Sequence, residues 1–214
     1  MVRNDQLGAN RLVNLAPSYY SFEKLYKYVD LGLPSGTLWA DRNVGADSPE
    51  AYGDYFAWGE TVIKDYYNWS TYKWCQGSGE TLTKYCTNSR YGTIDSKAVL
   101  DLEDDAAYVN MGKEWRMPTE NELNELYSEC TWLWTTQNGI NGYKVTGFNG
   151  HAIFLPAAGH RFGYNTLNEA GSCCSYWSSS VYENYPFGAW DLDNYSVDHD
   201  FNRCSGLAVR AVVR

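Results

Sequence analysis

Apolar and polar residues alternate in short runs along the first part of the chain, which predicts short strands. The run over 28–33 alternates, stops at a Pro-Ser-Gly triplet and is followed by an apolar return over 37–40. Two strands joined by a turn of this composition form a hairpin. A third strand is predicted over 55–60. A second hairpin is predicted over 143–155, where two apolar runs flank Asn149-Gly150.

The clearest local signal is the start of an amphipathic helix. Thr119 and Glu122 have the spacing of a capping box, in which each side chain accepts a hydrogen bond from the other residue's backbone amide. Apolar residues then recur at helical spacing on one face. The sequence therefore predicts a helix from about Glu120 to Cys130, followed by a strand over 131–135.

Acidic residues crowd the segment 101–107, and we weigh two interpretations of them. A calcium loop needs alternating oxygen ligands around a glycine, which this segment lacks. Carboxylates in the first turn of a helix are stabilised by the positive end of its dipole, so we expect a short helix here. Residues 18–27 are also compatible with a short helix, within an N-terminal arm that we assign to 1–27.

The C-terminal quarter combines apolar runs with polar intervals. Small, aromatic and β-branched residues form runs that predict buried strands, which we call the rails: 171–172, 176–180, 189–190 and 206–214. The intervals consist of Tyr, Asn, Asp and Ser, which is the composition of a contact surface. We call residues 161–205 the C-terminal strip, and we expect the rails to hold its polar intervals at the surface.

Length, composition and charge narrow the class of protein. A chain of 214 residues supports one sizeable core, so we assign 28–214 to a single domain. Nineteen Tyr, nine Trp and nineteen Gly, with many short predicted strands, indicate an α+β domain with short antiparallel strands, two or so helices and long irregular loops. The longest irregular segment is 61–94, and its tryptophans indicate that it is packed.

The charge excludes some partners. A formal net charge of −9, with no lysine after Lys144, argues against nucleic acid. No apolar run is long enough to cross a bilayer, so no membrane insertion is expected. No apolar leader follows Met1, and a virion-associated or cytoplasmic location is therefore favoured over secretion.

Candidate chemistry is sparse. The six cysteines are scattered and are expected to be mostly free thiols. The three histidines lie too far apart in sequence for a recognisable metal triad. One carboxylate cluster could bind calcium or a basic partner, although a solvated acidic loop is favoured. Its members are Asp191, Asp193, Asp198 and Asp200. We expect no catalytic residue, no metal and no cofactor.

Several motifs, in order along the chain, resemble one known family. They lie at 28–33, 39–40, 43–46, 52–60, 115–119, 154–159, 176–180 and 209–210. These motifs resemble the Fib-succ-type major paralogous domain, which is similar to the formylglycine-generating-enzyme subclass of the C-type lectin fold. The resemblance covers about residues 28–214 and implies a C-type-lectin-like fold.

The C-terminal strip resembles the variable region of proteins that are diversified by retroelements. In such systems mutation is confined to template adenines, commonly in Asn codons, which reach Tyr, His, Asp and Ser but not Lys, Gln, Met or Trp. Residues 162–205 contain no Lys, Gln or Met, and their only tryptophans lie in the rails. The resemblance implies a ligand-binding face made of Phe162, Tyr164, Asn165, Asn168, Tyr182, Asn184, Tyr185, Phe187, Asp191, Asp193, Asn194, Tyr195, Asp198, His199, Asp200 and Asn202.

The resemblance thus implies a binding protein rather than an enzyme. Its partner would be a macromolecular ligand, a bacterial surface protein or glycan, as for a phage receptor-binding protein. Sugar binding through calcium is not supported, because the chain has Trp190-Asp191-Leu192 where calcium-dependent lectins have Trp-Asn-Asp.

Two alternatives stay open. One is an oxidase of the formylglycine-generating type, although Cys173, Cys174 and Cys204 lack the spacing and the Arg-rich context of that family. The other is a structural module of a bacterial surface assembly, in which the C-terminal strip packs against a sister subunit in an oligomer.

Overall fold

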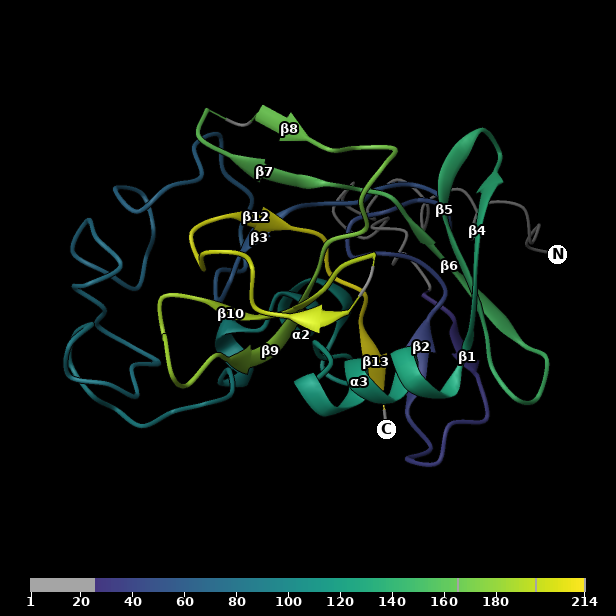
Figure 1. Ribbon diagram of the computed structural model, residues 1–214, viewed down its shortest axis with the longest axis horizontal. Coiled ribbons are helices and arrows are strands. Elements are labelled where there is room, and N and C mark those ends of the chain that lie inside the picture. The colour runs from purple at the N-terminus through teal and green to yellow at the C-terminus, as the bar shows by residue number, and fades with distance from the viewer. Residues whose placement is uncertain (1–25, 165, 195, 214) are drawn as a thin grey trace, which may run out of the picture.

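The computed structural model describes residues 26–164, 166–194 and 196–213. Within these ranges the chain has a mixed α+β architecture, in which small antiparallel sheets predominate over a few short helices (Figure 1). Nearly all of the predicted N-terminal arm, with its short helix over 18–27, lies outside the described residues.

The first sheet joins the two ends of the described chain. It contains β1 (Tyr28–Asp30), β2 (Leu38–Ala40) and β13 (Val212–Val213), in the order β1-β2-β13. Val29 pairs with Trp39, which confirms the predicted N-terminal hairpin with shorter strands. Trp39 in turn pairs with Val212 and is fully buried, so the C-terminal residues close the core over the first hairpin.

The second sheet carries one edge of the C-terminal strip. It contains β3 (Phe56–Ala57), β12 (Gly206–Leu207), β7 (His160–Phe162) and β8 (Thr166–Asn168), in the order β3-β12-β7-β8. The strand predicted over 55–60 is therefore real but only two residues long, because the chain turns immediately after it.

The third sheet is a three-stranded meander. It contains β4 (Thr131–Gln137), β5 (Ile140–Thr146) and β6 (Ala152–Pro156). Tyr143 pairs with Leu155, which confirms the second predicted hairpin. The longer pairing of β4 with β5 turns at Asn138 and Gly139, both with positive φ, a hairpin signal that the sequence carried and that the predictions above did not use.

The fourth sheet is the platform of the C-terminal strip. It contains β9 (Tyr176–Val181), β10 (Ala189–Leu192) and β11 (Val197–Asp198), with β10 in the middle. Figure 1 shows it at the centre of the view, with β7 and β8 above it and the longest helix below it.

Within the described ranges, three short helical elements complete the fold: η2 (Leu102–Asp104), α2 (Ala106–Met111) and α3 (Glu120–Glu129). The capping box of Thr119 and Glu122 is present, and Leu123 and Leu126 are the buried residues of α3, as predicted. α3 contacts all three strands of the fourth sheet. A short helix begins in the acidic segment 101–107 as expected, but the first turn of α2 contains no acidic residue. Asp105 is instead its N-cap and accepts from the amides of Ala107 and Tyr108.

The irregular segment 61–94 is packed, as predicted. Tyr67, Tyr72, Leu82 and Tyr85 are buried in it, although the segment contains no regular helix or strand. Its polar groups are satisfied by the rest of the domain. For example, the Tyr72 hydroxyl donates to the carbonyl of Trp58 at 2.7 Å.

Two rails differ from the prediction. Gly171 has φ +83° and lies in a turn, in which Ser172 donates to the Glu169 carbonyl, so 171–172 is not a strand. The rail predicted over 206–214 is buried wherever it is described, but only its ends pair as strands, β12 and β13. Between them, the carbonyls of Val209 and Ala211 accept from the backbone amides of Val44 and Ala40, and the Arg210 side chain donates to the carbonyls of Ala40 and Phe154.

Among the described residues, no helix combines the length and the apolar character that a membrane crossing requires.

Candidate ligand-binding surface

β9 fixes the platform in the domain. The Trp177 indole donates to the Phe56 carbonyl at 2.8 Å, and the Ser179 amide donates to the Pro118 carbonyl at 2.7 Å. Both residues are buried, as are Tyr176 and Ser178. A strand bonded on both sides in this way cannot shift without breaking buried hydrogen bonds, so the residues that follow it are presented on a rigid base.

Four rings from three parts of the C-terminal strip form what we call the aromatic cluster: Tyr182, Tyr185, Trp190 and His199. Tyr182 stacks on His199 with ring centroids 3.6 Å apart and an interplanar angle of 18°. Trp190 meets Tyr182 edge to face at 5.2 Å and lies 5.5 Å from His199. Tyr185 lies 5.8 Å from Tyr182 and is 49% exposed. The sequence predictions placed Trp190 in a buried rail, whereas the structure leaves it half-buried beside two of the predicted contact residues.

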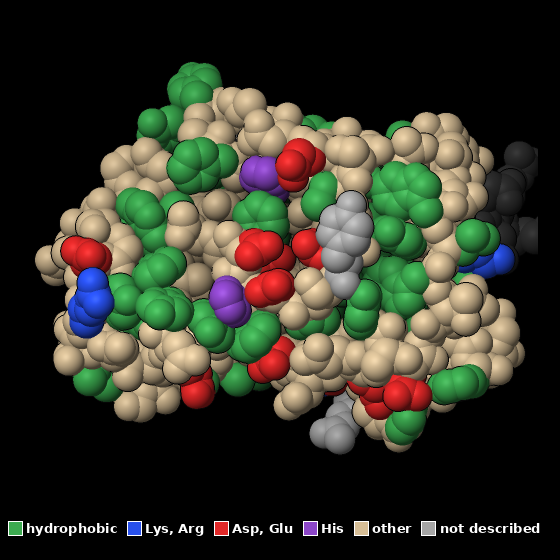
Figure 2. Space-filling model, in the orientation of Figure 1, with side chains coloured by type: hydrophobic (Ala, Val, Ile, Leu, Met, Phe, Trp, Pro, Cys, Tyr) green, Lys and Arg blue, Asp and Glu red, His purple; other side chains and the backbone are tan. Residues whose placement is uncertain are grey.

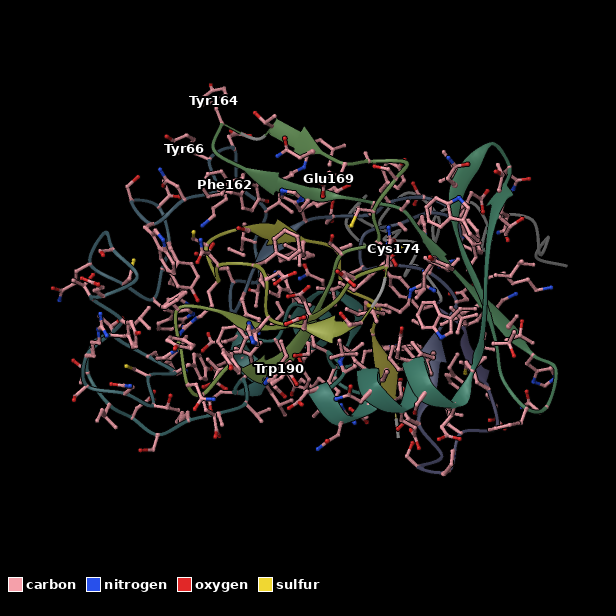
Figure 3. The ribbon with its side chains drawn as sticks, viewed as in Figure 1. Tyr66, Phe162, Tyr164, Glu169, Cys174 and Trp190 are labelled. Atoms are coloured by element: carbon pink, nitrogen blue, oxygen red, sulfur yellow. The ribbon has the colours of Figure 1, made fainter. Side chains whose placement is uncertain are left out.

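A second aromatic group lies at the end of the β7–β8 hairpin, where Figure 3 shows Tyr66, Phe162 and Tyr164 close together. Tyr164 is 80% exposed and Phe162 is 49% exposed. Tyr66, which is 38% exposed, comes from the irregular segment and lies 6.1 Å from Tyr164 between ring centroids. Tyr66 was not predicted as a site residue, because only the folded chain brings it to the C-terminal strip.

The irregular segment also supports the loop between β9 and β10. Tyr91 meets Phe187 edge to face at 5.3 Å and Tyr185 at 6.4 Å. The Thr87 hydroxyl donates to the Glu183 carbonyl at 2.7 Å. Phe187 is a predicted contact residue, but it packs on the core and therefore serves more as an anchor of this loop than as an exposed contact.

A cavity of about 340 Å³ opens beside the aromatic cluster. Tyr182, Trp190, Glu120 and Glu183 are among the residues that line it. The cavity thus has both aromatic and acidic residues in its lining.

The asparagines of the predicted face have different surroundings. Asn184 is exposed, and Asn168 and Asn202 are half-buried. Asn194 accepts from the Cys174 amide and donates to the Ser172 carbonyl, both at 2.8 Å, so its amide is used within the fold and is poorly placed to contact a ligand. Asn165 and Tyr195 lie outside the described residues.

Asp191 departs most from the expected surface role, because its side chain is fully buried. Trp190 and Asp191 are neighbours on β10, where the pairing with β9 shifts register between Ala189 and Asp191, and Trp190 is partly exposed whereas Asp191 is enclosed. Neither carboxylate oxygen has a hydrogen-bond partner within the described part of the chain. Burial raises the pKa of Asp191 well above its usual value, and the neighbouring carboxylates of Asp200 and Asp193 raise it further.

The other acidic residues surround this position nearer the surface. Asp198 is opposite Asp191 in the β10–β11 pairing, and its carboxylate accepts from the backbone amide of His199 at 2.8 Å. Asp193 accepts from the Ser196 amide at 2.8 Å, and Asp200 is exposed. Figure 2 shows acidic side chains and histidines gathered in the middle of this face, between hydrophobic side chains.

Two of the three cysteines of this region, Cys174 and Cys204, are buried, and Cys173 is half-buried. All six cysteines of the chain carry free thiols. Burial raises the pKa of Cys174 and of Cys204 to about 12, and it also raises the pKa of Cys173. Because the thiolate is the nucleophile, these residues have little reactive form at neutral pH.

No protein-family model matches the chain, and no curated protein and no solved structure matches it either.

Proposed function

We propose that this chain is a binding protein with a C-type-lectin-like fold, which presents the C-terminal strip to a macromolecular partner, a bacterial surface protein or glycan. The observation that carries the proposal is the aromatic cluster, in which rings from strand β10 and from separate loops contact one another and stay partly exposed beside a buried strand. Rings that are ordered before binding lose little conformational entropy when a partner covers them.

The proposal includes diversification of the C-terminal strip by a retroelement, as in a phage receptor-binding protein. Its physical basis is a division of labour within the strip. Residues of β9 hold the fold by buried backbone and indole bonds, whereas Tyr164, Tyr185 and Asn184 are exposed. Exchange of exposed side chains of this kind typically changes stability by less than about 0.5 kcal/mol, so the fold tolerates variation there.

The buried thiols favour binding over oxidase chemistry. An oxidase of the formylglycine-generating type needs an accessible, reactive cysteine pair. Cys174 and Cys204 are both fully buried and have strongly raised pKa values. Rapid labelling of these two thiols in the native protein would instead favour the oxidase.

The test compares binding of labelled protein to intact bacterial cells from a panel of strains. A strain that binds the wild-type chain is then tested with Tyr182→Ala/Tyr185→Ala and with Tyr66→Ala/Tyr164→Ala. Each buried contact ring typically contributes at least 2 kcal/mol, so we expect the first pair to reduce affinity by about 100-fold or more. The matched control is Tyr28→Ala, an exposed tyrosine on β1.

Binding that is unchanged in both double variants would refute the assignment of the surface, provided that circular dichroism shows both to be folded. The diversification is tested separately on the flanking DNA. A near-identical template copy that differs at adenines, next to a reverse transcriptase gene, would support it. A locus without such a copy would remove this part of the proposal.

A further inference from the structure

The buried carboxylate of Asp191 has no counter-charge within the described part of the chain. Its oxygens accept no hydrogen bond from the described residues, and the residue directly opposite it in the β10–β11 pairing is another acid, Asp198. A buried ionised carboxylate is costly unless it is paired, bonded or bound to a metal ion. Something outside these residues, a proton or a cation, must balance this charge.

Three consecutive residues above Asp191 offer ligand atoms at the right separation. One atom each of Asp198, His199 and Asp200 lie within 4.8 Å of one another. The His199 Nε2 atom is 3.7 Å from the Asp198 Oδ1 atom. Stacking on Tyr182 and the edge contact with Trp190 hold the imidazole in place, which reduces the entropy that an ion would have to remove.

Asp191 is directed toward this group. β10 and β11 are antiparallel, and Asp191 is the cross-strand partner of Asp198. Directly opposite residues of an antiparallel pair project from the same face of the sheet, with Cβ atoms about 5 Å apart. The buried unpaired carboxylate thus faces the surface donors from below, and it is not itself one of the three residues whose ligand atoms lie within 4.8 Å of one another.

We propose that Asp198, His199 and Asp200, with Asp191 beneath them, form a binding site for a divalent transition metal ion. The donor set decides the class of ion. Ca²⁺ and Mg²⁺ are held by oxygen ligands, whereas Zn²⁺ and Mn²⁺ accept imidazole together with carboxylates. His199 and Asp200 follow β11 near the surface, so an ion held there would keep coordination positions open. A ligand group from outside the chain could occupy those positions.

The proposal is tested with metal ions alone and does not depend on the partner proposed above. Mn²⁺ is the first probe, because hard Mn²⁺ suits carboxylate ligands and discriminates against the free cysteines. Tag-free protein is titrated with Mn²⁺, and the loss of the electron paramagnetic resonance signal of free Mn²⁺ is measured. We expect one ion per chain, displaced by Zn²⁺, which lies above Mn²⁺ in the affinity order of divalent ions.

Asp200→Asn and His199→Gln each remove one surface ligand, and we expect each to weaken Mn²⁺ binding by about tenfold or more. The matched controls are Glu103→Gln and His151→Gln, an exposed acid and an exposed histidine outside the C-terminal strip. Their affinity should equal that of the wild-type chain. Equal weakening in the controls, or no bound ion at millimolar Mn²⁺ or Zn²⁺, would overturn the site.

Asp191→Asn separates the two ways of balancing the buried charge. If Asp191 contributes to an ion site, the variant binds Mn²⁺ at least tenfold more weakly, while the metal-free protein becomes more stable because a buried charge is gone. Unchanged Mn²⁺ affinity would show that a proton alone balances Asp191 and would remove it from the site. Displacement of Mn²⁺ by Ca²⁺ as effectively as by Zn²⁺ would overturn the choice of a transition ion.

Discussion

Arg203 allows the sharpest test of how the C-terminal strip is held. Its side chain is fully buried, and its guanidinium makes four hydrogen bonds within the domain. The Nε atom donates to the Tyr72 hydroxyl at 2.9 Å. The two Nη atoms donate to the carbonyls of Tyr85, Pro186 and Lys84 at 3.0, 2.8 and 3.0 Å. One cation thus ties the irregular segment 61–94 to the loop that carries the aromatic cluster.

The perturbation is Arg203→Lys, which keeps the charge and changes the geometry. A lysine carries its three donors on one nitrogen, so it cannot reach acceptors that surround a planar fork. If two of the four hydrogen bonds are lost, at roughly 1.5 kcal/mol for each bond to a charged donor, the free energy of unfolding falls by about 3 kcal/mol. At this chain length each kcal/mol lowers the melting temperature by about 2–4 °C, so the expected decrease is about 6–12 °C.

Equilibrium unfolding in urea, followed by tryptophan fluorescence and by far-ultraviolet circular dichroism, measures the change. Arg90→Lys is the matched control, because Arg90 is exposed and its change should stay within about 0.5 kcal/mol. Hydrogen exchange of residues 182–188 adds a local readout, since Arg203 also donates its backbone amide to the Phe187 carbonyl. A loss below 1 kcal/mol, with unchanged exchange in this loop, would refute the reasoning.

Three further predictions concern acid stability, backbone space and thiols. Burial opposes ionisation of Glu122, but hydrogen bonds from Arg116 and from the helix cap at Thr119 outweigh it and hold the pKa of Glu122 at about 2. Ionised Glu122 therefore stabilises the domain above its unfolded pKa near 4.5, and this stabilisation is lost as the pH falls toward 2. Glu122→Gln should make the free energy of unfolding, measured in urea, depend less on pH between 4.5 and 2. Gly159→Ala should cost more than Gly171→Ala in thermal melts, because both have positive φ but only Gly159 would place its Cβ against backbone, at 2.0 Å. Cys174 and Cys204 should resist a thiol reagent at neutral pH until the chain is unfolded, and rapid labelling in the native state would revive the oxidase alternative.

Predictions that used short-range signals agree well with the structure. The helix that begins after Thr119 and the hairpin that turns near Asn149-Gly150 were both predicted from residues within a few positions of each other. Such signals work because caps and turns satisfy backbone groups locally. Most of the predicted strands were placed correctly, but 171–172 is a turn and several strands are shorter, because pairing partners from distant parts of the chain decide where a ladder ends.

The candidate site could be predicted only in part. Composition pointed to Tyr182, Tyr185 and His199, which the fold brings into one cluster. It could not show that Tyr66 lies beside Tyr164, since the irregular segment has no periodicity that reveals its position. The sequence also predicted, wrongly, that Trp190 is buried in a rail. A strand of three or four residues has too few alternations to show which of its side chains faces inward.

The sequence alone predicted an acidic, aromatic-rich domain with a capped helix, two hairpins and a polar strip between apolar runs. These features follow from composition and from interactions between residues close in sequence. Only the tertiary structure decided that Asp191 is enclosed and unpaired while Trp190 is partly exposed. It also decided that Arg203 joins the loop between β9 and β10 to the irregular segment 61–94. The physical reason is that burial and pairing depend on which distant segments cover a side chain, and no local pattern of residues records that.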